Sequence, residues 1–147
     1  MDPLISERRA VVAESEQISR SVLLWLNKWP DKPYRVDFEY LNPDAPCLTL
    51  STIQAAYKTK KYIDGAYEAQ YQFKIAYRLQ PTGNNERLNA DEALNAMADW
   101  ACSTAPDLGE GKNVRAVECN SRSSLFARYD NGSEDHQILM TMKYEVI

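Results

Sequence analysis

The sequence predicts an α+β domain in which two helices pack on one face of an antiparallel sheet of about four to six strands. Two segments place apolar residues at helical spacing, and several others alternate apolar and polar residues as strands do. The chain has no glycine-rich strand-to-helix turn and no repeated βαβ unit. Its 147 residues suit one domain, residues 1–147, without an internal linker.

The first 27 or so residues are predicted to form a helix. Apolar side chains recur there at spacings of three and four, which places them on one helical face. They are Ile18, Val22, Trp25, Leu26 and Trp29, and Val11 and Val12 extend the pattern backwards. Two prolines, Pro30 and Pro33, mark the end of the helix because its backbone cannot continue cheaply through them.

Two strands are predicted next. Residues 34–40 alternate strictly between apolar and charged side chains, which is typical of a strand with one buried face. The loop Leu41 to Pro46 ends this strand, and a second strand is expected at about Cys47 to Thr52. Residues 53–61, here called the arm, fit either a continued strand or an extended segment that carries lysines.

The clearest strand pattern covers residues 67–79. Apolar residues occupy every odd position over these thirteen residues, which indicates a long strand near the centre of its sheet. Gly65 before it can adopt the positive φ of a tight turn. Residues 81–85 contain proline, glycine and asparagine and end the strand.

A second helix is predicted from about Ala90 to Ser103. Asn89 is the expected N-cap, and Glu92 stands where a capping-box acid belongs. The expected inner face consists of small and apolar residues, namely Ala93, Leu94, Met97, Ala98 and Ala101. Three strands follow, at about 114–120, at about 125–129 and from about 137 to the end, with a hairpin tip at 130–133.

Composition argues against several classes of function. The net charge of −4 and the pI near 5.1 argue against stable nucleic-acid binding, which usually needs a basic excess. No apolar run is long enough for a membrane helix, and the N-terminal residues do not predict a signal peptide. The three cysteines, Cys47, Cys102 and Cys119, are expected to be reduced, buried and structural in a cytosolic compartment.

No combination of residues predicts catalysis, a metal site or a cofactor. His136 is the only histidine, and its place beside Glu134 and Asp135 at a hairpin base predicts an exposed loop residue. A single histidine cannot build a typical catalytic zinc site. Asp37 and Glu39 share one strand face, which ordinary polar alternation explains. We therefore expect a protein that is not an enzyme.

The candidate interface is the one basic cluster of the chain. Lys58, Lys60 and Lys61 lie between Tyr57 and Tyr62, and three further bases, Lys28, Lys32 and Arg35, belong to the same predicted cluster. Lysines on an edge strand block unwanted pairing, which is the simplest interpretation. A contact with a protein partner, or stacking of a nucleic-acid single strand on the tyrosines, remains an alternative.

The central block resembles a known family. The strings Lys61-Tyr62-Ile63-Asp64-Gly65 and Gln70-Tyr71-Gln72-Phe73 resemble a tail-module family of tailed bacteriophages and prophages of Gram-positive bacteria, described as minor capsid or minor tail proteins. The order of elements is similar too, with Trp100 as the tryptophan of the second helix. Some members carry the label chloramphenicol resistance protein, which this sequence does not support because no HxxxDG motif surrounds His136.

The resemblance implies a structural role without catalytic residues or cofactors. The family is similar in design to tail terminator and tail completion proteins, which form a ring, usually a hexamer, on the end of the tail tube. It implies contacts with the tail-tube protein and a head-completion protein, and a place in the virion tail after assembly in the host cytoplasm. The alternatives are another small virion part, either a head–tail connector or a tail-tube subunit, or a binding module that is not an enzyme.

Ring assembly requires contacts between identical subunits that close on themselves. Sheet edges and loops are natural places for such contacts. We therefore expect the arm and the loop from Asn42 to Pro46, with Asn42 and Asp44, to take part in the interface.

Overall fold

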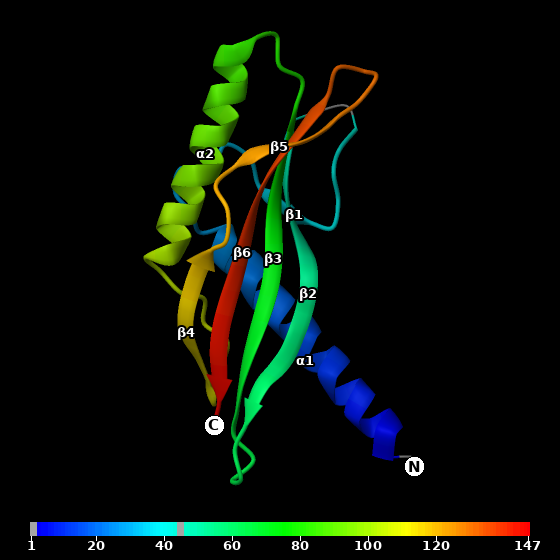
Figure 1. Ribbon diagram of the computed structural model, residues 1–147, viewed down its shortest axis with the longest axis vertical. Helices are drawn as coiled ribbons and strands as arrows, with labels where there is room; N and C mark the ends of the chain where they lie inside the picture. The colour runs from blue at the N-terminus through cyan, green and yellow to red at the C-terminus, as the bar shows by residue number, and fades with distance from the viewer. Residues whose placement is uncertain (1–2, 44–45) are drawn as a thin grey trace.

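The computed structural model describes residues 3–43 and 46–147, with the backbone alone at 3–13, 15 and 54–57. The fold is α+β, with a mostly antiparallel sheet whose strands are ordered β1-β2-β3-β6-β4, while β5 also pairs with β6 (Figure 1). The elements in chain order are α1 Pro3–Leu26, β1 Val36–Phe38, β2 Cys47–Lys61, β3 Tyr67–Leu79, α2 Asn84–Cys102, β4 Lys112–Cys119, β5 Ser124–Arg128 and β6 Glu134–Val146.

Helix α1 confirms the first predicted helix, and it ends at Leu26 before the two prolines. Figure 1 shows α1 crossing behind the sheet. Its predicted apolar stripe, from Ile18 to Trp29, is buried. Trp25 stacks on Trp100 of α2 with the ring centroids 5.5 Å apart, and its indole Nε1 donates to Thr104 Oγ1 at 2.9 Å. The two helices therefore contribute to one core, because aromatic side chains join them directly.

The predicted strand at 34–40 is shorter in the structure, where β1 covers only Val36–Phe38. It runs parallel to β2 and pairs with residues 48–50. The side chain of Asn27 bonds both backbone polar groups of Val36, which fixes the start of β1 against the end of α1. Glu39 then adopts a φ of 54°, which is outside strand geometry and ends β1.

The arm is a continuation of β2, which resolves the alternative left open by the sequence. Strand β2 pairs antiparallel with β3 from Cys47 to Lys61. The register shifts three times, at 52/54, 54/57 and 58/60. These irregularities interrupt the period-two pattern, which explains why the sequence of the arm does not alternate like that of β3.

Strand β3 forms as predicted, over Tyr67–Leu79, and it lies between β2 and β6 near the centre of the sheet. Odd residues of β3 and even residues of β6 face the helices and supply much of the core. The buried residues of this layer include Tyr71, Phe73, Ile75, Ile138, Met140, Met142 and Tyr144. They pack against α1 and α2 residues such as Ile18, Val22, Leu94, Met97 and Ala98.

Helix α2 begins at Asn84, several residues before the predicted start, so the capping prediction is wrong. Gly83 is the N-cap and makes no side-chain hydrogen bond. Instead, Thr82 donates from its backbone N–H and its hydroxyl to the Glu86 carboxylate, at 2.9 and 2.8 Å. Asn89 and Glu92 lie inside the helix. The predicted inner face is confirmed for Leu94, Met97, Ala98 and Ala101, which are buried together with Ala90.

The last three strands form close to the predicted places. Both β4 and β5 pair with β6, each along a different part of it. Gly132 has a φ of 87° in the predicted hairpin tip, where such a value favours glycine. Strand β6 begins at Glu134, earlier than predicted, and this places Glu134, Asp135 and His136 inside the sheet.

Candidate functional site

The predicted interface residues lie at two opposite ends of β2. Lys58, Lys60 and Lys61 are exposed at the far end of the arm, and Tyr62 follows in the turn. Tyr57 pairs with Gln70 through the backbone of β2. Asn42 lies near the start of β2, where its backbone N–H meets the Cys47 thiol at 3.2 Å. Asp44 lies outside the described residues, so its predicted role stays a prediction.

The structure does not gather all predicted bases into one patch. Arg35 directly precedes β1, which pairs with residues 48–50, whereas Lys58, Lys60 and Lys61 lie near the opposite end of β2. The arm is therefore the basic part of β2, and the loop around Asn42 is a separate surface.

The lysines of the arm lie over tyrosines of the same chain. Lys58 Nζ is 4.4 Å from the ring centroid of Tyr67, and Lys60 Nζ is 5.2 Å from that of Tyr62. The Tyr62 hydroxyl donates to Glu68 Oε1 at 3.0 Å. These rings already have partners, so stacking of nucleic-acid bases on them would require those contacts to be exchanged.

Tyr67 is also tied to α1 through its hydroxyl, which donates to Glu14. Burial and this carboxylate raise the pKa of Tyr67 far above its ordinary value of 10.0. The Tyr67 hydroxyl therefore stays protonated, and this side chain links the start of β3 to α1.

One edge of the sheet is open along the arm. The short β1 covers β2 only at residues 48–50, and the backbone N–H of Glu39 then donates to the Leu50 carbonyl at 2.9 Å. The Glu39 carboxylate accepts the next bond, from the Thr52 N–H at 2.8 Å. Within the described ranges, β3 is the only strand that pairs with residues 53–61 (Figure 1).

The opposite edge is open as well. Strand β4 pairs with β6 on one side, and no strand of the described part of the chain pairs with its other side. Unpaired strand edges present rows of N–H and C=O groups to which another strand can bind. The sheet therefore offers two long edges for association.

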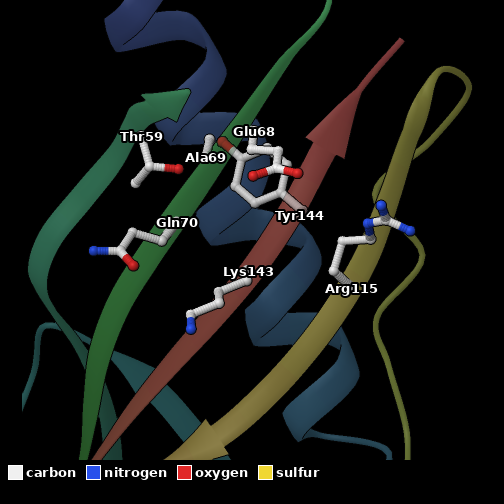
Figure 2. A pocket seen from close by; sticks show the side chains of 7 residues that line it. All are labelled: Thr59, Glu68, Ala69, Gln70, Arg115, Lys143 and Tyr144. Atoms are coloured by element: carbon white, nitrogen blue, oxygen red, sulfur yellow. The ribbon is translucent and has the colours of Figure 1, made fainter. Parts of the chain in front are cut away.

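A shallow hollow of about 340 Å³ lies between the arm, β3, β6 and β4 (Figure 2). Its lining residues are Thr59, Glu68, Ala69, Gln70, Arg115, Lys143 and Tyr144. Its charges are matched locally, because Lys143 pairs with Glu118 at 3.3 Å and Arg115 pairs with Glu145 at 3.4 Å. The hollow thus presents no concentration of one charge sign that would select an ionic ligand.

The start of β6 carries a group of buried charges that the sequence interpretation missed. Glu134 is only 2% exposed, yet its carboxylate accepts hydrogen bonds from Arg87 of α2 and Arg128 of β5 at 2.8 to 3.0 Å. Burial alone would raise the pKa of Glu134, but these two guanidinium groups outweigh it and lower the pKa to about 2. Glu134 therefore joins α2, β5 and β6 as a carboxylate.

Asp135 makes the equivalent connection on the other side of β6. Arg78 of β3 donates to both carboxylate oxygens, at 2.7 and 2.9 Å, and the Tyr129 hydroxyl donates at 2.6 Å. Burial tends to raise the pKa of Asp135, but the bonds from Arg78 and Tyr129 lower it on balance. A bidentate arginine pair of this kind fixes geometry as well as charge.

His136 is buried at 3% exposure, so the prediction of an exposed loop histidine is wrong. It lies inside β6 and faces α2, and its Nδ1 is 2.8 Å from Asp91 Oδ1. The Ser123 hydroxyl donates to the same oxygen at 2.7 Å. A serine nucleophile would need its hydroxyl on the imidazole, whereas Ser123 contacts the aspartate. This geometry fits a structural link between α2, β6 and the segment before β5.

The remaining predicted residues are spread over the fold. All three cysteines are free; Cys47 is buried and Cys119 is half-buried, but Cys102 is exposed, which corrects its prediction. Burial raises the pKa of the Cys47 thiol. Asp37 and Glu39 do not act together, since Glu39 binds Thr52 and Asp37 lies 3.6 Å from Arg35.

Among the residues that the structure describes, no group of three or more His, Cys, Asp or Glu side chains could hold a metal ion. None of the described helices is long and apolar enough to cross a membrane. Models of protein families were compared with the chain without a match, and the curated proteins gave no match either.

Proposed function

We propose that this chain is a structural virion protein that assembles with copies of itself into a ring, as a tail terminator or tail completion subunit at the end of a phage tail tube. The observation that carries the proposal is the open edge of β2 along the arm, residues 53–61. The sequence resemblance supplies the virion context, and the ring would be a hexamer in that family.

The open edge supports assembly for a physical reason. A long unpaired edge leaves backbone donors and acceptors that a neighbouring strand can satisfy. Natural monomers usually protect such edges, with lysines among other devices, and the arm has Lys58, Lys60 and Lys61. In this proposal those lysines disfavour pairing of the arm with strands other than the one in the neighbouring subunit.

The layered arrangement is consistent with the same role. Both helices pack on one face of the sheet, so the other face and the two edges are left for contacts with neighbouring subunits, the tube protein and the head-completion protein. Such a subunit needs no cofactor and no catalytic residue, and we propose that it has neither.

Light scattering after size exclusion, over a series of protein concentrations, tests self-assembly. The proposal expects one closed species of fixed size, visible as rings in negative stain. Open filaments would instead support the alternative of a tail-tube subunit, because a terminator stops at one ring. Added to growing tail tubes, the protein should halt elongation, and undiminished growth would contradict the terminator role.

A pair of variants ties the assembly to the arm. Ile53 is 51% exposed at the open edge, so Ile53→Asp should weaken association at least tenfold while the monomer still folds. Leu24→Asp is the matched control, because Leu24 is 68% exposed on α1 and belongs to neither open edge. Equal association of the two variants would mean that the arm is not the interface.

A further inference from the structure

We propose that the strand which pairs with the arm is β4 of a second copy of this chain, running antiparallel to β2 in a head-to-tail arrangement. This inference rests on the self-assembly proposed above, and it names the two surfaces that meet. It requires the two open edges to match in level and direction.

The two edges lie at the same level of the sheet. At one end, Lys61 pairs with Tyr67, Tyr67 with Val146, and Val146 with Lys112, in one row across four strands. A second row, at the other end, runs through Thr52, Phe73, Met140 and Cys119. The arm and β4 therefore cover the same stretch of the sheet, between these two rows.

The strand directions also match. Each of the three pairings from β2 through β3 and β6 to β4 is antiparallel, so β4 runs opposite to β2. A second copy placed beside the first in the same orientation thus brings its β4 antiparallel to the first copy's β2. Such a contact is heterologous and can repeat until a ring closes.

The join has a defined upper boundary. The Glu39 carboxylate accepts the hydrogen bond from the Thr52 N–H, and β1 pairs with residues 48–50 beyond it. On the other side of the sheet, β4 ends at Cys119 and the chain leaves the edge before β5. Both edges are therefore open only between this row, which contains Thr52 and Cys119, and the row that contains Lys61 and Lys112.

Symmetry separates this join from the main competing arrangement. If two arms paired with each other about a twofold axis, the contact would close as a dimer and leave the β4 edge of each copy open. The head-to-tail join uses both edges of every copy and can repeat until a ring closes. The second copy is thus expected to supply β4 rather than β2.

Crosslinking of an Ile53→Cys variant tests the join. Ile53 lies in the bulge next to the row that holds Cys119, so the new thiol should come within reach of the native Cys119 of the neighbouring copy. A short bismaleimide in a Cys102→Ser background should then give covalent dimers and higher multimers on a denaturing gel. Within one chain the two edges are three strand spacings apart, about 14 Å, which is too far for the shortest reagent.

Two controls isolate the contact. Ile53→Cys combined with Cys119→Ser removes the expected partner thiol and should abolish the multimers. Leu88→Cys in the Cys102→Ser background places an equally accessible thiol on α2, where Leu88 is 59% exposed, and should give no multimers. Peptide mapping of the dimer should identify residues 53 and 119.

The outcomes separate this inference from the proposed function. A closed ring without the 53–119 crosslink would overturn the β2–β4 join and leave the ring subunit in place. The crosslink in a species that grows into open filaments would support the join and contradict the terminator role. A monomer that gives no crosslink at the highest attainable concentration would overturn the inference.

Discussion

Glu134 is held by two arginines that lie far from it in the sequence or across a turn. Arg87 comes from α2 and Arg128 from β5, and both bind a carboxylate that is almost completely buried. Removing one partner from such a cluster leaves buried groups without compensation, which usually costs more than the intact pair contributes.

We expect Glu134→Gln to destabilise the fold by about 1–3 kcal/mol, because the amide cannot replace the charge that faces both guanidinium groups. Urea unfolding measures this loss. Glu118→Gln is the matched control, since its ion pair with Lys143 is half exposed and should contribute less than about 1 kcal/mol. Equal losses in the two variants would show that burial of Glu134 has no energetic consequence.

The pKa of Glu134 also predicts a dependence of stability on pH. Its folded value of about 2 lies below the ordinary value of 4.5, so its contribution is present above pH 4.5 and is lost as the pH falls toward 2. The urea midpoint of unfolding should therefore fall as the pH is lowered from about 6 to about 2.5, and it should fall less in Glu134→Gln. Identical slopes in both proteins would exclude Glu134 as the titrating group.

His136 shows why the sequence does not place every single residue. The strand pattern is clear from Ile138 onward, but the acidic residues before it resemble a polar hairpin base. In the structure their partners Arg78, Arg87 and Asp91 come from other elements. Only those long-range partners make burial of three consecutive polar residues favourable.

The start of α2 is the clearest difference at the level of elements. Residues 84–89 lack apolar periodicity, so the sequence pattern predicts a later start, whereas the helix begins after Gly83. Thr82 and Glu86 bond each other across its first turn. The hydrogen bonds from Thr82 lower the pKa of the Glu86 carboxyl, in agreement with a charged cap.

Asn89→Ala distinguishes the two helix starts. If Asn89 were the N-cap, its loss would destabilise the protein, but it is exposed inside the helix, where alanine is favoured by about 0.5 kcal/mol. We therefore expect a small rise in the thermal unfolding midpoint. Thr82→Ala should lower the midpoint, and the reverse order of the two variants would contradict the observed start.

At the scale of the whole molecule, the sheet has two open edges that cover the same rows of residues. Beyond those rows, the shorter strands β1 and β5 pair with β2 and β6. The proposed join would place Lys61 of one copy near Lys112 of the next, because both belong to one row of the sheet. Like charges in facing positions weaken strand pairing.

Lys112→Glu should therefore strengthen association, by up to about fivefold for a cross-strand charge pair. Sedimentation velocity at several concentrations measures the change. Lys28→Glu is the control, because it alters the net charge equally on an exposed residue that follows α1 and belongs to neither open edge. Weaker association of Lys112→Glu than of Lys28→Glu would contradict the proposed register.

The sequence by itself determined the α+β class, the extent of β3, the buried stripe of α1 and the inner face of α2. Each follows from a local period that a buried face imposes on neighbouring residues. Only the tertiary structure decided the parallel direction of β1, the pairing of the arm with β3, the burial of His136 and the alignment of the two open edges. These features depend on contacts between residues far apart in the chain, which no local pattern records.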